Sequence, residues 1–236
     1  MIEYPLAPIG VVRSPYREKF AIPRQSGLAH IDAVVELSAP YAHPEAVAGL
    51  DQFSHLWLVF IFHAVAVRAA AASEWKPLVR PPRLGGNERI GVFATRSTHR
   101  PNPVGLSAVE LLRIETDGGV RLHIRGADLL DGTPVLDIKP YIPYADAIPQ
   151  ARAGFAQQAP QRLPLRWRDG ALVAARRVSP ELEGIVAETL CFDPRPAYHD
   201  EPERIYGVRI GDVDVRFRID STGVEIVGVE PLDSAD

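Results

Sequence analysis

The amino-acid sequence predicts a mainly β protein, in which an N-terminal β-barrel or strongly curved sheet precedes a smaller unit of helix and sheet. Two observations carry this prediction. Six or seven short strand-like segments follow one another closely before residue 140, which is typical of a barrel and unlike alternating βαβ units. After residue 179 the pattern changes to one helical stripe and three strands. We therefore expect domains at residues 1–145 and 146–236.

The first strands of the barrel are bounded by turn-forming residues. We expect strands over 8–14 and 30–37, separated by a charged loop without periodicity, and a short helix near 44–50. Residues 54–63 are apolar on both faces, which indicates a strand buried on both sides at the centre of a sheet or barrel.

Hairpin signals define the remaining barrel strands. Residues 105–115 fit a strand or a helix, and the neighbouring strands favour a strand. Asp117-Gly118-Gly119 is a hairpin turn signal, after which residues 120–125 alternate as the returning strand. A second turn at Asp131-Gly132 precedes a strand over 133–140.

The smaller domain begins with a segment of weak periodicity. Residues 144–177 are rich in Ala, Gln, Pro and Arg, and we interpret them as a linker with some helix. Ser179-Pro180-Glu181 is a helix start, with a capping hydroxyl, a proline in the first turn and an acid facing the helix dipole. The helix is expected to stop at Asp193-Pro194, and a meander of three strands follows.

Composition is that of a globular cytoplasmic protein. The hydrophobic fraction of 46% is ordinary for a chain that buries a core. The single cysteine, Cys191, excludes an intramolecular disulfide and a cysteine-based metal cluster. The first residues lack the pattern of a signal peptide, and the longest apolar run, 56–67, is too short to span a bilayer. We expect a cytoplasmic location and no membrane partner.

Charge is distributed unevenly along the chain, whose net charge is −4. Between Lys76 and Arg100 there are six basic residues and one acid, whereas the chain from Ser179 onward carries 14 acids and 5 arginines. Within the basic stretch, the apolar run Ile90–Ala94 predicts a single strand with a turn at each end. Such a strand presents cations beside a cleft, so we expect an anionic ligand there. The alternative is a solvated basic loop.

Several enzyme classes lack their motifs in this sequence. No GxGxxG follows a strand and no GxxxxGK[ST] is present, so Rossmann and P-loop folds have no support. The seven histidines are scattered without a metal-ligand spacing, and we expect no metal. Cys191 follows an apolar helical stripe, which favours core packing over a nucleophilic role.

Two other segments combine groups that can do chemistry. Asp128 and Asp131 flank a hydrophobic pair in a turn, where carboxylates either bind ribose hydroxyls or a cation, or stabilise the turn itself. Asp137 and Lys139 lie on one face at a strand end, next to Tyr141. A carboxylate, an amine and a phenol together can transfer protons, and the alternative is a structural ion pair.

Five motifs run through most of the chain, almost continuously over residues 9–141 and again near Tyr198. They are I-G-V-V-R-S-P-Y-R-E-K-F-A-I-P-R-Q-S-G, G-L-D-Q-F-S-H-L-W-L-V-F-I-F-H, R-P-P-R-L-G-G-N-E-R-I-G-V-F-A-T-R-S-T-H-R-P-N-P-V-G-L-S, D-L-L-D-G-T-P-V-L-D-I-K-P-Y and D-P-R-P-A-Y. Together they closely resemble the tRNA N6-threonylcarbamoyladenosine methyltransferase family, TrmO. One departure is His99, where a family member has Phe.

The resemblance implies a β-barrel methyltransferase that uses S-adenosyl-L-methionine and works as a homodimer. Its implied activity is methylation of N6 of N6-threonylcarbamoyladenosine at position 37 of tRNA, in the anticodon loop, with the small C-terminal domain aiding tRNA recognition. Carried over residue by residue, the implied cofactor contacts are Pro23, Arg24, Gln25, His63, Ala64, Arg96, Leu106, Asp128, Leu129, Leu130 and Asp131.

Chemistry suggests a role for each group of these residues. A methionine carboxylate needs a cation such as Arg24 or Arg96, and adenosine hydroxyls suit Asp128 or Asp131. The catalytic candidates, for the base and for orienting the urea, are Asp137, Lys139 and Tyr141. The arginines expected to meet tRNA phosphates or the substrate carboxylate are Arg80, Arg83 and Arg100. The alternative function is a non-catalytic RNA-binding or regulatory module that senses S-adenosylmethionine.

Overall fold

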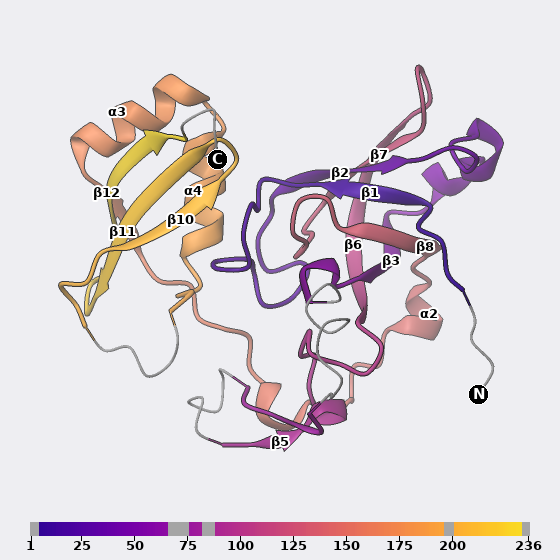
Figure 1. Ribbon diagram of the computed structural model, residues 1–236, viewed down its shortest axis with the longest axis horizontal. Helices are drawn as coiled ribbons and strands as arrows, with labels where there is room; N and C mark the ends of the chain where they lie inside the picture. Colours follow the sequence, from indigo (N-terminus) through magenta and orange to yellow (C-terminus); the bar gives the residue numbers. More distant parts are fainter. Residues whose placement is uncertain (1–4, 66–75, 82–87, 196–200, 233–236) are drawn as a thin grey trace.

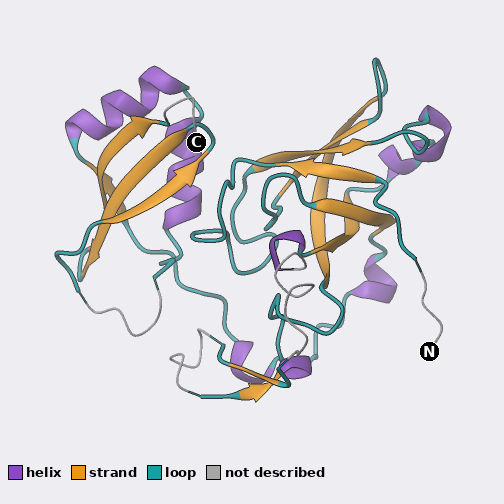
Figure 2. Ribbon diagram, in the orientation of Figure 1, coloured by secondary structure: helices purple, strands orange, loops and turns teal. Residues whose placement is uncertain are grey.

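The computed structural model describes residues 5–65, 76–81, 88–195 and 201–232, and these form two units that lie side by side (Figure 1). The N-terminal unit is a closed barrel with strand order β1-β2-β7-β6-β3-β8. The second unit is a four-stranded sheet with two helices (Figure 2). The predicted mainly β fold, a barrel followed by a small α+β unit, is confirmed. No helix among the described residues is long and apolar enough to cross a membrane.

Alternation along the barrel strands separates an inner from an outer face. The strands are β1 Gly10–Arg13, β2 Asp32–Leu37, β3 His55–Ile61, β6 Val104–Glu115, β7 Arg121–Arg125 and β8 Pro134–Pro140. On β3, Leu56, Leu58 and Phe60 are buried in the barrel core, so Trp57 and Val59 point outward. β3 pairs with β6 on one side and with β8 on the other, but only its inner face is buried. The prediction of a strand buried on both faces is therefore wrong, because the outer face of this barrel strand is partly open to solvent.

The second unit has a core of its own, built by two helices packed on a sheet. Its elements are β9 Leu165–Trp167, α3 Asp169–Val178, α4 Leu182–Leu190, β10 Tyr206–Ile210, β11 Val213–Asp220 and β12 Gly223–Pro231. Phe217, Val186 and Leu190 are fully buried there, and Cys191 is also in this core, as predicted. The expected three-stranded sheet is wrong by one strand, because β9 adds to β12 in parallel. The segment interpreted as a linker thus contains β9 and α3, besides α2 Pro143–Asp146 and a 3-10 turn at Gly154–Ala156.

The segment that follows β1 joins the two units. The Gly211 N–H donates to the Pro15 carbonyl at 2.7 Å, and Tyr16 forms a β-bridge with Ile210. Phe20 packs against the core of the second unit, with its ring centroid 6.4 Å from that of Tyr206 and 6.2 Å from that of Phe217. This loop of the N-terminal unit is therefore anchored by the C-terminal one.

The basic stretch differs from its prediction. β4 Leu78–Val79 pairs with β5 Ile90–Gly91, and Val92–Ala94 then form a 3-10 turn. A single strand over Ile90–Ala94 is therefore wrong. The turn forms because Val92 is buried and its carbonyl accepts hydrogen bonds from the Thr95 N–H at 3.1 Å and the Thr95 hydroxyl at 2.8 Å.

The helix expected near 44–50 also differs from its prediction. It is two 3-10 turns, at Pro44–Val47 and Leu50–Gln52.

Candidate functional site

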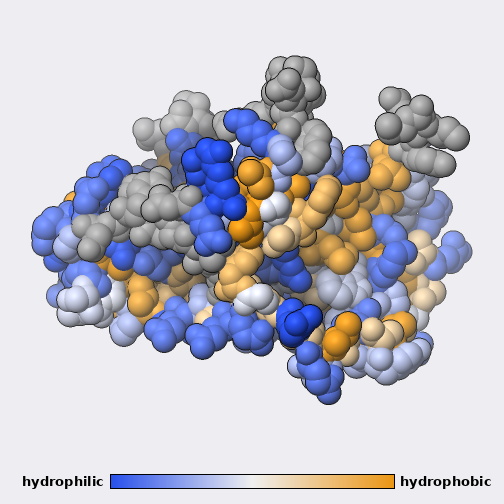
Figure 3. Space-filling model, turned by 90° about the horizontal axis from the view of Figure 1, so that it is seen from below, coloured by the Kyte–Doolittle hydropathy of each residue, from blue (hydrophilic) through white to orange (hydrophobic). Residues whose placement is uncertain are grey.

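A cavity of about 670 Å³ lies where β3 meets β6, lined by residues from segments 19–25, 57–64, 95–107 and 128–133. Phe60 and Ser107, which line it, face the barrel interior, whereas Trp57, Val59 and Leu106 face outward. The cavity therefore reaches from the barrel interior onto the outer face of β3. Its mouth exposes apolar side chains, and the face of the molecule in Figure 3 likewise has apolar areas between hydrophilic ones.

A partly buried carboxylate forms one wall of the cavity. The Ser107 hydroxyl, itself buried, donates to Asp128 Oδ1 at 2.6 Å. Burial raises the pKa of the Asp128 carboxyl above its ordinary value, and the Ser107 hydrogen bond and the charge of Arg96 oppose that rise. The Gly27 N–H donates to the Gly126 carbonyl at 2.8 Å, so the segment that contains Gln25 is tied to the turn that contains Asp128.

Two arginines of the segment that follows the 3-10 turn line the same cavity. Arg96 donates from Nη1 to Gln25 Oε1, and both residues line the cavity. Arg100 also lines it, but its Nη1 donates to the Thr95 carbonyl at 2.7 Å and contacts the Val92 carbonyl at 3.4 Å. These contacts of the Arg100 side chain stabilise the 3-10 turn that precedes Arg96.

Comparison with known proteins identifies the family. Residues 11–147 match the sequence model of the tRNA-methyltransferase O N-terminal domain, and residues 160–232 match that of the TrmO C-terminal domain. The chain belongs to the TrmO family. An Escherichia coli tRNA (adenine(37)-N6)-methyltransferase is 45% identical over 98% of this chain and 100% of its own length. A protein of that same name from Eikenella corrodens is 53% identical over 71% of this chain and 92% of its own.

Relatives with other descriptions and solved structures extend this likeness. A Pseudomonas aeruginosa protein described as a candidate S-adenosylmethionine-dependent methyltransferase is 50% identical over 90% of this chain and 91% of its own. A crystal structure of TrmO from Pseudomonas aeruginosa superposes with a TM-score of 0.78 at 38% identity, over 97% of this chain and 99% of that one. A second TrmO crystal structure from that species gives a TM-score of 0.80 at 40% identity, over 98% of each chain.

In this TrmO family member, ten of the eleven residues that the sequence suggests for cofactor contact line the one cavity. They are Pro23, Arg24, Gln25, His63, Ala64, Arg96, Leu106, Asp128, Leu129 and Leu130. Burial, together with the positive charge of Lys19, lowers the pKa of His63 below its ordinary value, so His63 is neutral near pH 7 and adds no charge to the site.

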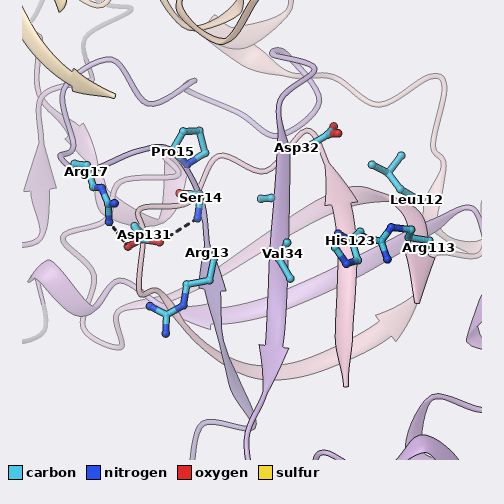
Figure 4. A pocket seen from close by; sticks show the side chains of 11 residues that line it. Arg13, Ser14, Pro15, Arg17, Asp32, Val34, Leu112, Arg113, His123 and Asp131 are labelled. Carbon is cyan, nitrogen blue, oxygen red and sulfur yellow. Dashed lines mark hydrogen bonds and ion pairs between the residues drawn. The ribbon is translucent and has the colours of Figure 1, made fainter. Parts of the chain in front are cut away.

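Asp131 is the exception, because it points away from that cavity. Its carboxylate forms an ion pair with Arg17 Nη1 at 2.8 Å and accepts from the Ser14 N–H at 3.1 Å (Figure 4). Both contacts face a separate hollow on the outer surface of the barrel. The sequence left open whether Asp128 or Asp131 binds the ribose hydroxyls of the cofactor. In the structure only Asp128 lines the cavity, and Asp131 lines the separate hollow.

The three expected catalytic residues lie beside the cavity rather than in it. Asp137 and Lys139 form an ion pair of 2.7 Å, with side chains 48% and 65% exposed. On the outer face of the barrel, Asp137 stands opposite Val59 and Lys139 opposite Trp57. The Tyr141 ring packs against that of Trp57, with 5.5 Å between their centroids.

The structure describes two of the three residues expected to bind tRNA. Arg80 is exposed just after β4 and does not line the cavity, Arg100 does line it, and Arg83 lies outside the described residues.

Two residues of the cavity, Ser107 and Trp57, were not among those that the sequence indicated. The alternation of β3 and β6 was the available signal, because it puts Ser107 on the inner face and Trp57 on the outer one.

Proposed function

We propose that this TrmO family member transfers a methyl group from S-adenosyl-L-methionine to N6 of adenosine 37 in tRNA, where that adenosine bears an N6-threonylcarbamoyl group. The observation that carries the proposal is the cavity, which brings Arg96 and the partly buried Asp128 together with eight other expected cofactor contacts. The names of the relatives in E. coli and E. corrodens support the same activity.

The residues of the cavity suit the chemistry of that cofactor. A guanidinium such as Arg96 binds a carboxylate through charge-assisted hydrogen bonds, and the Asp128 carboxylate accepts from hydroxyl or ammonium groups. Apolar Phe62 and Leu129 line the same space and can cover the less polar part of the ligand. When bound, S-adenosylmethionine supplies an electrophilic methyl group, so this chain mainly has to bind, align and exclude water.

Asp137, Lys139 and Tyr141 serve the substrate in this proposal. The N6 proton of a carbamoylated adenine is more acidic than that of an amine, so a carboxylate such as Asp137 suffices to accept it while the new N–C bond forms. The Lys139 ammonium is a partner for the threonyl carboxylate. The Tyr141 hydroxyl orients the urea.

Further contacts belong to the same proposal. Arg80 and Arg83 meet tRNA phosphates, Arg100 approaches the substrate from the cavity wall, and the smaller domain, residues 146–236, aids tRNA recognition.

We also propose a cytoplasmic homodimer as the working form. Sedimentation equilibrium tests that state, because a monomer at micromolar concentration would contradict it.

Mass spectrometry of tRNA nucleosides tests the proposed function. Incubation with enzyme and S-adenosylmethionine is expected to add one methyl group to threonylcarbamoyladenosine. tRNA that lacks the threonylcarbamoyl group is the matched control, and we expect it to stay unmethylated. Cofactor binding in a calorimeter without methyl transfer to any tRNA would instead favour the sensing module.

A further inference from the structure

We infer that Trp57 is the platform on which the purine ring of the substrate nucleoside stacks, immediately beside the part of the cavity that we assign to the cofactor. This inference rests on the proposed function. Trp57 lines the cavity and is only partly buried. It also packs on Tyr141, at 5.5 Å and an interplanar angle of 43°, so one residue joins the cavity to the candidate catalytic group.

The strand register orders these residues in rows across the outer face of the barrel. In one row, Val59 stands between Leu106 of β6 and Asp137 of β8. In the next, Trp57 stands between Ala108 and Lys139. Two residues along a strand span about 7 Å, so Trp57 is one step from the row that contains Leu106. Ala108 contributes only a methyl group, which leaves space beside the indole.

The groups around Trp57 match the substrate in chemistry. Bases of single-stranded RNA loops are recognised by stacking on aromatic side chains, and an enzyme that modifies a base must take it out of the loop stack. The Lys139–Asp137 pair beside Trp57 is exposed, so its ammonium and carboxylate can reach the polar substituent on N6. An aromatic platform with a cation next to it fits a purine that carries a carboxylate.

Tryptophan fluorescence tests the assignment directly. The chain has three tryptophans, Trp57, Trp75 and Trp167, so the double variant Trp75→Phe/Trp167→Phe leaves Trp57 as the only indole. With S-adenosylhomocysteine bound, an anticodon stem-loop RNA containing threonylcarbamoyladenosine is expected to quench its emission. The variant Trp57→Phe/Trp75→Phe, which retains Trp167 packed against the core of the smaller unit, is the matched control and should be quenched much less.

Each other outcome of that titration overturns the inference. Quenching by S-adenosylhomocysteine alone, with no further change on adding RNA, would assign Trp57 to the cofactor. Unchanged emission while filter binding shows bound RNA would mean that Trp57 only packs on Tyr141. If the RNA does not bind at all and no tRNA is methylated, the proposed function fails first and this inference falls with it.

Kinetics provide a second, independent readout. In Trp57→Ala, kcat/KM for tRNA is expected to fall by roughly 5- to 150-fold, the range measured for losing one base–aromatic stack. Trp57→Phe should restore most of it, and calorimetric affinity for S-adenosylhomocysteine should change less than about twofold in either variant. Tyr41→Ala, at an aromatic residue 40% exposed elsewhere on the barrel, is the control. An unchanged kcat/KM in Trp57→Ala with methylation intact would refute the platform and leave the proposed function standing.

Discussion

At the scale of single residues, the Ser107 hydroxyl stabilises the charged form of a carboxylate in the cavity wall. Ser107 donates to Asp128 at 2.6 Å and so stabilises the ionised carboxylate against the effect of burial. Ser107→Ala should raise the pKa of Asp128 further, so a smaller fraction is charged at a given pH. We therefore expect the acid limb of S-adenosylhomocysteine binding to shift to higher pH, measured by calorimetry from pH 4 to 8 in steps of about half a unit.

A double-mutant cycle isolates this effect from the titration of His63, which also lines the cavity. In an Asp128→Asn background there is no carboxyl left to titrate, so adding Ser107→Ala should leave the limb where it is. A shift of equal size in that background would show that Ser107 does not act through Asp128.

Within the basic stretch, we expect Arg80 to bind tRNA and Arg96 to bind the cofactor. Arg80 is exposed away from the cavity, so Arg80→Ala should weaken tRNA binding and reduce the slope of log K against log salt by about 0.7–0.9. Arg96→Ala should lower S-adenosylhomocysteine affinity about tenfold or more, because it removes charge-assisted hydrogen bonds. Filter binding over a salt series and calorimetry measure the two effects. Equal loss of cofactor affinity in both variants would contradict this division.

At the scale of elements, a glycine in β6 shapes the cavity. A Cβ at Gly105 would overlap the Phe60 ring and come within 2.9 Å of Phe62 Cζ, and these two rings pack edge to face at 5.2 Å. Gly105→Ala should therefore cost about 1–3 kcal/mol in the free energy of unfolding, measured in urea, and weaken cofactor binding as the rings move. Gly91→Ala is the matched control, because no atom of the described residues lies within 4 Å of a Cβ there. Equal stability of the two variants would contradict this packing argument.

β7 was predictable because burial of its inner face imposes an alternation that its sequence displays. β3 was instead recognised as a strand by its continuous apolar run. β9 was not, because its three residues are all only partly buried and form no alternating pattern. Ile90–Ala94 is apolar throughout, yet the Thr95 hydroxyl bonded to the Val92 carbonyl favours a turn that hydrophobicity cannot reveal. For the candidate site, the motifs indicated the cavity residues. They could not separate Asp128 from Asp131, since two side chains of one turn can face opposite surfaces.

At the scale of the whole molecule, the C-terminal unit packs against a loop of the barrel unit that continues into the cavity lining. Phe20 packs among Tyr206 and Phe217, and Pro23 to Gln25, which follow it closely, line the cavity. Arg24 Nη2 also contacts the Asp193 carbonyl at 3.3 Å. The two units are thus coupled through one loop, so we expect the smaller unit to influence cofactor binding as well as any contact with RNA.

Phe20→Ala tests that coupling, because Phe20 itself does not line the cavity. We expect a loss of about 1–3 kcal/mol in the free energy of unfolding and weaker binding of S-adenosylhomocysteine at temperatures where the variant stays folded. Phe53→Ala, at a residue 37% exposed elsewhere on the barrel, is the control. Wild-type cofactor affinity in folded Phe20→Ala would show that the loop does not transmit the anchoring.

The most direct test of the account is a crystal structure of the protein with S-adenosylhomocysteine. We predict ligand density in the cavity between β3 and β6, with its carboxylate at Arg96 or Arg24, its polar groups at Asp128, and the Trp57 ring left open beside it. Ligand density in the hollow beside Asp131, or the adenine ring of S-adenosylhomocysteine stacked on Trp57, would contradict this arrangement.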